Sequence, residues 1–334
     1  MSININTNKH KFIMRIPLVS CCLLVMLFGC SQAGNGEQTA PPVSQMGLST
    51  NSVTVNGLNF HYVEKGSGQV MLLLHGFPYF GSAWYKVMHA FADDYQVIAP
   101  DNRGYGYSDK PDKVSEYHIE KLVSDVKQLI QAFSPNKKVI LVGHDWGAAL
   151  AWGLAQVHPE LVSKVIIING APTNVFLNVL ANSKLQREQS KYLHKLNGWF
   201  AKLMFAIRGP NLLWRGVSRM HESGQVDDKF KSVFIDTWNQ SKAAQSAVNW
   251  YVANFPLFDE IEEQDYWPSK QAQVFVPSLL IWSKDDPAFS QDVFNAIPSY
   301  VNDLSIEVID TSSHTPFLDH SEQVIAFMRK YLKD

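Results

Sequence analysis

From residue 51 onward, short apolar runs alternate with amphipathic stretches. The turn signal Asn56-Gly57 joins two β-rich runs, Ser52–Val55 and Leu58–Val63, and so predicts an opening hairpin. Four brief apolar runs follow, which is typical of strands covered on both faces: Val70–Leu74, Gln96–Ala99, Lys138–Val142 and Val165–Ile168. Amphipathic stretches lie between them, at Ala83–Ala92, Ile119–Ala132 and Ala148–Val157. This order predicts an α/β domain with a mostly parallel sheet.

The pattern changes after Ala171. Residues 173–258 have helical periodicity and no convincing strand pattern, which returns at Pro277–Trp282 and Leu304–Ile309 before a closing helix from Phe317 to Leu332. We therefore expect an eight-stranded sheet in an α/β core formed by residues 51–172 and 259–334. A helical cap, residues 173–258, is inserted between its sixth and seventh strands.

The N-terminus has the pattern of a targeting signal. Lys9, Lys11 and Arg15 precede an apolar run, Ile16 to Gly29, that is too short to span a bilayer. The run ends in Leu27-Phe28-Gly29-Cys30, which resembles a bacterial lipobox, although Phe28 is bulky for such a site. We expect residues 1–29 to be a lipoprotein-type signal peptide, Cys30 to carry the lipid, and residues 30–50 to be a flexible tether. A plain secretory signal with a chance cysteine is the alternative.

Export would place the mature domain outside the cytoplasm, and its cysteine content and net charge are consistent with that. Ser31 follows the lipid-bearing position, and by resemblance to Gram-negative lipoproteins this favours the outer membrane, with the domain facing the periplasm. All three cysteines lie in the signal segment, so the mature domain has no thiol for a disulfide or a metal. The first thirty residues hold three basic and no acidic residues, which leaves 26 basic against 31 acidic and a net charge of −5. This balance argues against a nucleic-acid partner.

The segment Gly143-His144-Asp145-Trp146-Gly147 follows an apolar strand and opens a helix of small residues. Its glycines flank Asp145 at the spacing of a nucleophile elbow, where serine commonly stands. Small neighbours relieve the clash around a strained nucleophile, although Asp145 as a simple helix N-cap is the alternative. A carboxylate is already ionised at pH 7 and suits attack on a strained or activated sp3 carbon. The sequence thus predicts a covalent ester on Asp145 and disfavours esterase and peptidase chemistry.

The partners of this nucleophile follow from the order of the strands. Phe77, in the turn after the third strand, and Trp146 are predicted to supply the N–H groups of an oxyanion hole, unless the first is part of a plain turn. The acid is expected after the seventh strand, where the position of Asp286 before Pro287 favours it over Asp285. The histidine is expected after the eighth strand, at His314; His320 falls within the closing helix. Asp286 would orient His314, and His314 would activate water against the ester.

These residues resemble the epoxide hydrolase family of the α/β-hydrolase fold, over roughly Val53 to Leu332. The resemblance rests on residues 75–78 (HGFP), 101–111 (DNRGYGYSDKP) and 143–147 (GHDWG), together with Asp286 and His314. It implies two cap tyrosines that hydrogen-bond the epoxide oxygen and protonate the alkoxide. Tyr251 in Asn249-Trp250-Tyr251 matches the second of these, and we assign the first to Tyr192. For either, the alternative is a core tyrosine with a satisfied hydroxyl.

Two other functions stay open. Haloalkane and haloacid dehalogenases share the Asp nucleophile, and the indole of Trp146 could supply half of a halide cradle. The haloalkane group has Asn where Phe77 stands and the fluoroacetate group has Arg where Trp146 stands, so both departures disfavour dehalogenation. A non-catalytic receptor is the third possibility, and the complete triad disfavours it. The predicted partners are a small apolar substrate and water, with no cofactor or metal. The sequence leaves the substrate and the oligomeric state undetermined.

Overall fold

The computed structural model of the protein describes residues 42–196 and 199–333. The predicted signal peptide and Cys30, the residue predicted to carry the lipid, lie outside these residues. Within the described residues, none of the helices combines the length and the apolar character that crossing a membrane requires.

The described chain forms an eight-stranded sheet in the order β1-β2-β4-β3-β5-β6-β7-β8. The strand β2 pairs antiparallel with β1 and with β4, and the remaining pairs are parallel. This arrangement confirms the predicted fold class. The strands are β1 (Ser49–Val55), β2 (Leu58–Lys65), β3 (Gln69–Leu74), β4 (Tyr95–Pro100), β5 (Val139–His144), β6 (Val162–Ile168), β7 (Ser278–Ser283) and β8 (Leu304–Ile309).

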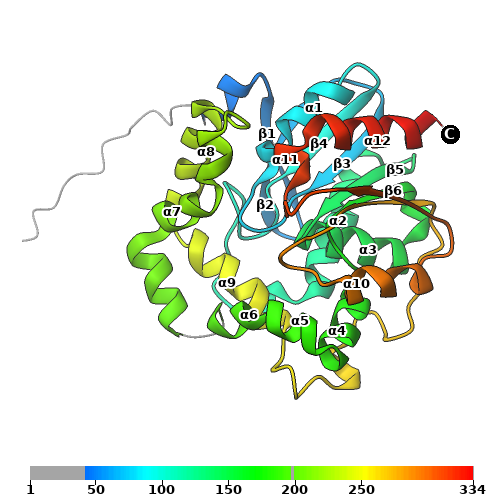
Figure 1. The fold of residues 1–334 in the computed structure, drawn as a ribbon. Helices are drawn as coiled ribbons and strands as arrows, with labels where there is room; N and C mark the ends of the chain where they lie inside the picture. The colour runs from blue at the N-terminus through cyan, green and yellow to red at the C-terminus, as the bar shows by residue number, and fades with distance from the viewer. Residues whose placement is uncertain (1–41, 197–198, 334) are drawn as a thin grey trace, which may run out of the picture. The chain divides into compact units, whose positions relative to one another are not determined.

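Helices cover both faces of the sheet, with α1 packed against α12 on one side and α2 against α3 on the other (Figure 1). Because the central strands are covered twice, β3, β5 and β7 are buried along almost their whole length. Replacing a buried leucine of β3 by alanine is expected to cost ~2–5 kcal/mol of stability. The core helices are α1 (Tyr85–Phe91), α2 (Ile119–Phe133), α3 (Trp146–Val157), α10 (Gln291–Ala296), α11 (Pro316–Asp319) and α12 (Ser321–Lys333).

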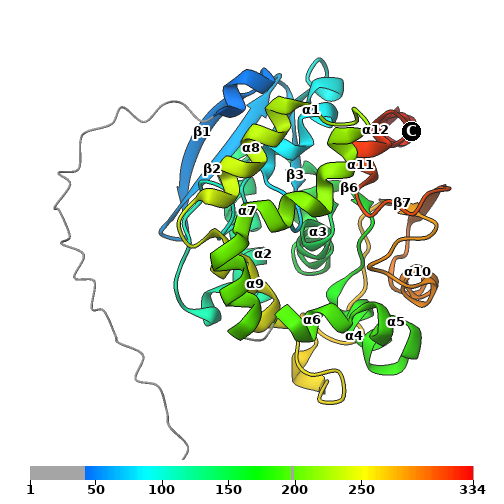
Figure 2. The same ribbon diagram turned by 60° about the vertical axis from the view of Figure 1, so that its left-hand side comes forward.

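Among the described residues, six α-helices lie between β6 and β7, where the helical insertion was expected, and Figure 2 shows them gathered along one side of the sheet. They are α4 (Thr173–Asn182), α5 (Lys184–Gln189), α6 (Lys191–Leu196), α7 (Trp199–Glu222), α8 (Asp228–Asn239) and α9 (Ala243–Asn254). Two indole N–H groups tie this cap to core loops: Trp238 donates to the Pro78 carbonyl and Trp250 to the Arg103 carbonyl, both at 2.9 Å. The cap therefore rests on the loops that follow β3 and β4.

Short 3-10 helices complete the described chain: η1 (Pro42–Met46), η2 (Gly81–Trp84), η3 (Val114–Tyr117), η4 (Pro159–Leu161), η5 (Glu263–Asp265) and η6 (Ile297–Tyr300). The first of these differs from expectation, because residues 42–50 fall within the predicted tether. Val43, Met46 and Leu48 are buried in the core, and β1 begins at Ser49. Burying apolar area is favourable whatever the spacing of the side chains, so this segment packs on the core although its sequence shows no helical or strand periodicity.

The closing helix also differs from expectation. It is broken at His320 into α11 and α12, so His320 ends a helix and does not lie within one. Its ring Nδ1 lies 2.8 Å from Oδ1 of its neighbour Asp319, which accounts for this histidine locally.

Candidate active site

Asp145 stands in a strained turn between β5 and α3, with φ 52° and ψ −119°. The backbone is packed so tightly here that a Cβ on Gly143 would lie 2.4 Å from the Gly147 carbonyl oxygen. The neighbouring loop approaches as closely: a Cβ on Gly76 would lie 2.2 Å from Oδ1 of Asp145. Both distances are far below van der Waals contact, so glycine is required at these positions. The turn presents the carboxylate beyond the carboxyl end of β5.

Main-chain N–H groups bind the carboxylate of Asp145. The Phe77 N–H donates to Oδ1 at 2.9 Å, and the Trp146 N–H also hydrogen-bonds the carboxylate. These are the two N–H groups that the sequence placed in an oxyanion hole. The Phe77 N–H binds an oxygen that is already anionic, so it is positioned for an oxyanion that develops on the same atom, and the Trp146 N–H binds the same carboxylate.

Asp286 and His314 meet behind the nucleophile. His314 Nδ1 lies 2.8 Å from Oδ2 of Asp286, whose side chain is completely buried. The other oxygen of Asp286 accepts the N–H groups of Ala288 at 2.7 Å and Phe289 at 3.1 Å. Asp285, the rival in the sequence, is exposed to solvent. The structure thus brings Asp145, His314 and Asp286 together in one chain of contacts.

Asp145 and His314 influence each other's protonation, and the charge of Asp286 influences that of His314. Burial opposes a charge on His314, but Asp286 and Asp145 outweigh it and raise the pKa of the ring to about 10. Burial likewise opposes the charge on Asp145, yet the His314 cation lowers the pKa of that carboxyl. In the resting site Asp145 is therefore a carboxylate and His314 a cation. The ring can act as a base only once the charge on Asp145 has been removed.

Asp145 lines a cavity of about 40 Å³. Tyr192, from α6, and Tyr251, from α9, line the same cavity. Its other lining residues are mostly apolar: Trp146, Ala149, Ala171, Thr173, Phe176, Leu193, Phe255 and Phe289. The ordinary pKa of tyrosine, about 10, leaves both phenols protonated at neutral pH. Desolvation, followed by the charge of Asp145, raises the pKa of the buried Tyr251 further. Tyr251 is buried, whereas Tyr192 is 41% exposed at the cavity's edge. The side chain of Trp146 hydrogen-bonds Tyr251.

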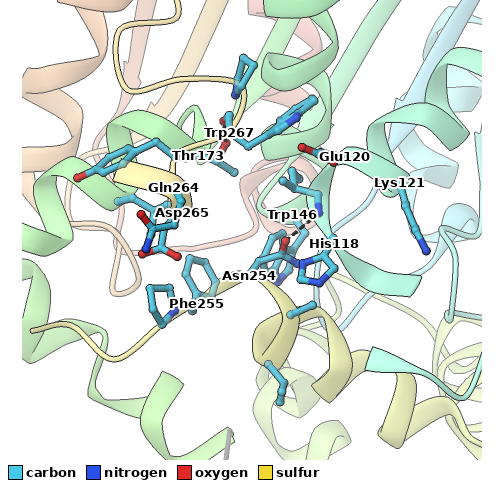
Figure 3. A pocket seen from close by; sticks show the side chains of 17 residues that line it. His118, Glu120, Lys121, Trp146, Thr173, Asn254, Phe255, Gln264, Asp265 and Trp267 are labelled. Carbon is cyan, nitrogen blue, oxygen red and sulfur yellow. Dashed lines mark hydrogen bonds between the residues drawn. The ribbon is translucent and has the colours of Figure 1, made fainter. Parts of the chain in front are cut away.

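A second hollow has a volume of about 540 Å³, and Figure 3 shows the side chains that line it. The two share Trp146, Thr173 and Phe255, so these three side chains form the wall between them. The hollow is larger but lacks the nucleophile, and Lys121 in its lining is paired with Glu116 at 2.8 Å. We place the chemistry in the smaller cavity, because the carboxylate and the two phenols meet there.

The motif at residues 101–111 positions a loop. The Asp101 carboxylate accepts the N–H groups of Gly81 at 2.8 Å and Tyr107 at 3.0 Å, and it contacts His61 Nδ1 at 2.8 Å. Burial opposes its charge, but these partners, His61 foremost, lower the pKa of Asp101 to about 2. Asn102 connects this block to the oxyanion loop.

His75 of the HGFP motif has a structural role in the described chain. Its Nε2 accepts the Asn102 N–H at 3.0 Å, and its carbonyl accepts the Asn102 side-chain amide at 2.8 Å. Burial lowers the pKa of the ring, which is therefore neutral. Neutrality lets Nε2 act as an acceptor, so His75 fixes the loop that carries the Phe77 N–H.

His144, which precedes the nucleophile, has no separate role in the sequence-based prediction. Its side chain is fully buried, and its Nε2–H donates to the His314 carbonyl at 2.8 Å. Burial, and then the His314 cation, lowers the pKa of His144 to about 4. The contact with the His314 carbonyl places His144 against the histidine loop, with its ring centroid 5.0 Å from that of His314. Across the described residues, no group of three or more His, Cys, Asp or Glu could hold a metal ion.

Comparisons with known proteins agree with this architecture. A family model described as alpha/beta hydrolase fold matches residues 69–321. Human epoxide hydrolase 4 is 30% identical over 289 residues, covering 84% of this chain and 77% of that protein. The superfamily protein YfhM of Bacillus subtilis is 28% identical, covering 86% of this chain and 99% of that protein. An inhibitor complex of Bacillus megaterium epoxide hydrolase superposes with a TM-score of 0.79 at 28% identity, covering 85% and 100% of the two chains. The chain therefore belongs to the epoxide hydrolase family of α/β-fold hydrolases.

Proposed function

We propose that this protein opens an apolar epoxide to a vicinal diol through a covalent ester on Asp145. The observation that carries the proposal is the content of a single cavity. A carboxylate bound by main-chain N–H groups shares this cavity with two protonated phenols, Tyr192 and Tyr251. A nucleophile and two acids on one small apolar cavity suit a ring whose carbon is attacked while its oxygen is protonated.

In the first step, Oδ2 of Asp145 attacks one epoxide carbon and the bond from that carbon to the ring oxygen breaks. The freed oxygen takes a proton from Tyr251, with Tyr192 as its second hydrogen-bond donor. The protonated His314 then returns a proton to the phenolate through solvent. The step leaves a hydroxyalkyl ester on Asp145, a neutral phenol and a neutral imidazole.

In the second step, His314 takes a proton from water while the water oxygen attacks Cγ of Asp145. The negative charge develops on Oδ1, which the Phe77 N–H binds, with the Trp146 N–H as the second proposed donor. Collapse breaks the bond between Cγ and Oδ2, and the departing alkoxide takes the proton from His314. Asp145 then gives up its acid proton to the imidazole, which restores the resting ion pair and releases the diol.

Two observations support an epoxide over a halide. A halide would need N–H donors in place of acids, but the Trp146 side chain already hydrogen-bonds Tyr251. The Phe77 side chain packs edge-on against Trp238 and Tyr251 and contributes only apolar surface. A further structure of the Bacillus megaterium enzyme, 28% identical to this chain, contains its product (R)-3-[1]naphthyloxy-propane-1,2-diol. A diol product is consistent with the chemistry proposed for Asp145.

The decisive experiment uses His314→Gln, which lacks the base for the second step. Incubated with an aryl epoxide, the variant is expected to gain the mass of the whole epoxide and to keep it on the peptide that contains Asp145. Incubation with a bromoalkane in parallel distinguishes the alternatives. An adduct of the alkyl group with loss of bromide would indicate a dehalogenase. Absence of both adducts would contradict the proposal and favour a binding protein.

The location of the protein is a separate proposal. The basic residues, apolar run and lipobox-like end of residues 1–30 support export and attachment through Cys30 to the outer membrane, with the domain facing the periplasm. Metabolic labelling with a fatty acid tests this. We expect label on the wild-type protein and none on Cys30→Ala, and equal labelling of the two would contradict the anchor.

A further inference from the structure

One buried asparagine contacts all three loops that carry the triad. Asn169 directly follows β6, is completely buried and has a left-handed backbone with φ 42°. Its main chain contacts the nucleophile turn and a neighbouring strand: its carbonyl accepts the Asp145 N–H at 3.2 Å, and its own N–H donates to the Ile281 carbonyl of β7 at 3.0 Å. Asn169 is thus part of the support beneath the nucleophile.

The side chain of Asn169 reaches the other two loops. Its Oδ1 accepts the Ser283 N–H at 2.7 Å, at the end of the strand that leads to Asp286. Its Nδ2 group donates to Oγ of Ser283 at 3.0 Å, to the Ser313 carbonyl at 3.0 Å and to the His314 carbonyl at 3.1 Å. Both ends of the amide are therefore used, and each end requires the atom that an asparagine places there.

The His314 carbonyl is the point where these contacts bear on catalysis. It accepts from Asn169 and also from His144 Nε2 at 2.8 Å. Two donors on one carbonyl fix the main chain of the histidine loop relative to β5 and β6. The imidazole ring of His314 is attached to this main chain. The two hydrogen bonds therefore also set the position of the ring Nε2 relative to Asp145.

We propose that Asn169 is a positioning residue for ester hydrolysis, which keeps His314 aligned between Asp286 and Asp145. The inference rests on the proposed function. Formation of the ester depends on the Asp145 carboxylate and on phenols that come from the cap, none of which Asn169 orients through its side chain. Hydrolysis depends on His314, and a displacement of about 1 Å of a catalytic group can cost ~100-fold in rate. Loss of the Asn169 amide therefore slows the second step selectively.

A buried asparagine can also be a purely structural residue, and the chain offers a matched control. Asn174 in α4 is equally buried, and its Nδ2 donates to two main-chain carbonyls, those of Lys270 at 3.2 Å and Ala272 at 3.1 Å. Neither of these carbonyls belongs to a triad loop. Asn174→Asp thus removes the same kind of contact without touching the histidine loop.

The experiment compares Asn169→Asp, Asn169→Gly and Asn174→Asp with wild type. Aspartate removes the donors at constant shape, and glycine removes the whole side chain while tolerating the positive φ. With an aryl epoxide, we expect both Asn169 variants to lose ~100-fold in the rate of ester hydrolysis. Ester formation in a single turnover should stay within a few-fold of wild type, so that the adduct on Asp145 accumulates in the intact mass. Asn174→Asp should accumulate none. Equal losses in both steps, or no adduct from either Asn169 variant, would overturn the inference.

A second readout does not depend on the substrate. The His314 Nδ1–H bonded to Asp286 should give a low-field proton resonance in the free enzyme, identified by its absence from His314→Gln. We expect this resonance to broaden or shift in both Asn169 variants and to be unchanged in Asn174→Asp. If wild type opens no epoxide, the proposed function fails, and this resonance still decides whether Asn169 positions His314. An unchanged resonance in both Asn169 variants would contradict that role.

Discussion

The ring of His314 faces Oδ2 of Asp145 across 3.6 Å, which is longer than a hydrogen bond. The opposite ring nitrogen is bound by Asp286 at 2.8 Å, so the ring cannot move closer to the nucleophile without breaking that contact. Oδ2 is consequently stabilised by a nearby positive charge while its lone pairs stay available for attack. The same separation leaves His314 able to reach a water molecule beside Cγ.

The two neighbouring carboxylates after β7 provide a matched pair of substitutions. Asp286→Asn should reduce kcat by ~10⁴-fold, because the amide no longer holds the productive tautomer of His314 or stabilises its cation. Asp285→Asn, at an exposed position, should leave kcat within about two-fold of wild type. Steady-state kinetics on both variants test this assignment. A large loss with Asp285→Asn and none with Asp286→Asn would reverse the assignment.

The cap phenols are expected to act in ester formation. Tyr251→Phe and Tyr192→Phe should each slow the single-turnover formation of the ester by ~10–100-fold, since the alkoxide loses one of its two donors. The double variant should be slower than either alone. Quenching of protein fluorescence on adduct formation provides the measurement, because Trp146 lines the cavity. Tyr266→Phe, a tyrosine of the larger hollow, is the control and should react like wild type.

The two chemical steps should differ in their pH dependence. With Asp145 ionised, the pKa of His314 is about 10, but the ester removes that charge and lowers the pKa of the ring. Hydrolysis should therefore rise with pH through a value below 10, as His314 becomes neutral. Ester formation should weaken only at strongly acidic pH, because the pKa of Asp145 is lowered and its carboxylate persists there. Rapid-quench measurement of both steps from pH 5 to 9 tests this, and identical profiles would contradict it.

The burial of His144 should make the free energy of unfolding of the protein depend on pH in the acidic range. Its folded pKa, about 4, lies below the ordinary value of 6.5, so the unfolded chain binds the proton first as pH falls. Between these values the contribution of His144 to the free energy of unfolding should decline by about 1.4 kcal/mol per pH unit. His144→Gln retains an amide donor for the His314 carbonyl but has no proton to bind. Urea unfolding from pH 7 to 4 should show a shallower decline for the variant, and parallel curves would contradict the prediction.

Much of the fold follows from local patterns in the sequence. Two-residue and 3.6-residue periodicities depend only on near neighbours, and they placed β8 at the same residues that the structure shows. The elbow around Asp145 is equally local, because the clash that glycine relieves involves residues within one turn. The order of the strands then directed attention to the loops that hold Asp286 and His314.

Other features depend on contacts between residues far apart in the chain, and only the tertiary structure decided them. Asp285 and Asp286 are adjacent and alike, yet only one is buried against His314. Residues 42–50 read as a tether, but Val43 and Met46 are buried in the core. Asn169 belongs to no motif, and its importance lies in partners up to 145 residues away. A sequence determines which groups can donate, accept or be buried, whereas the partner of each buried polar group is chosen by the packing of the whole chain.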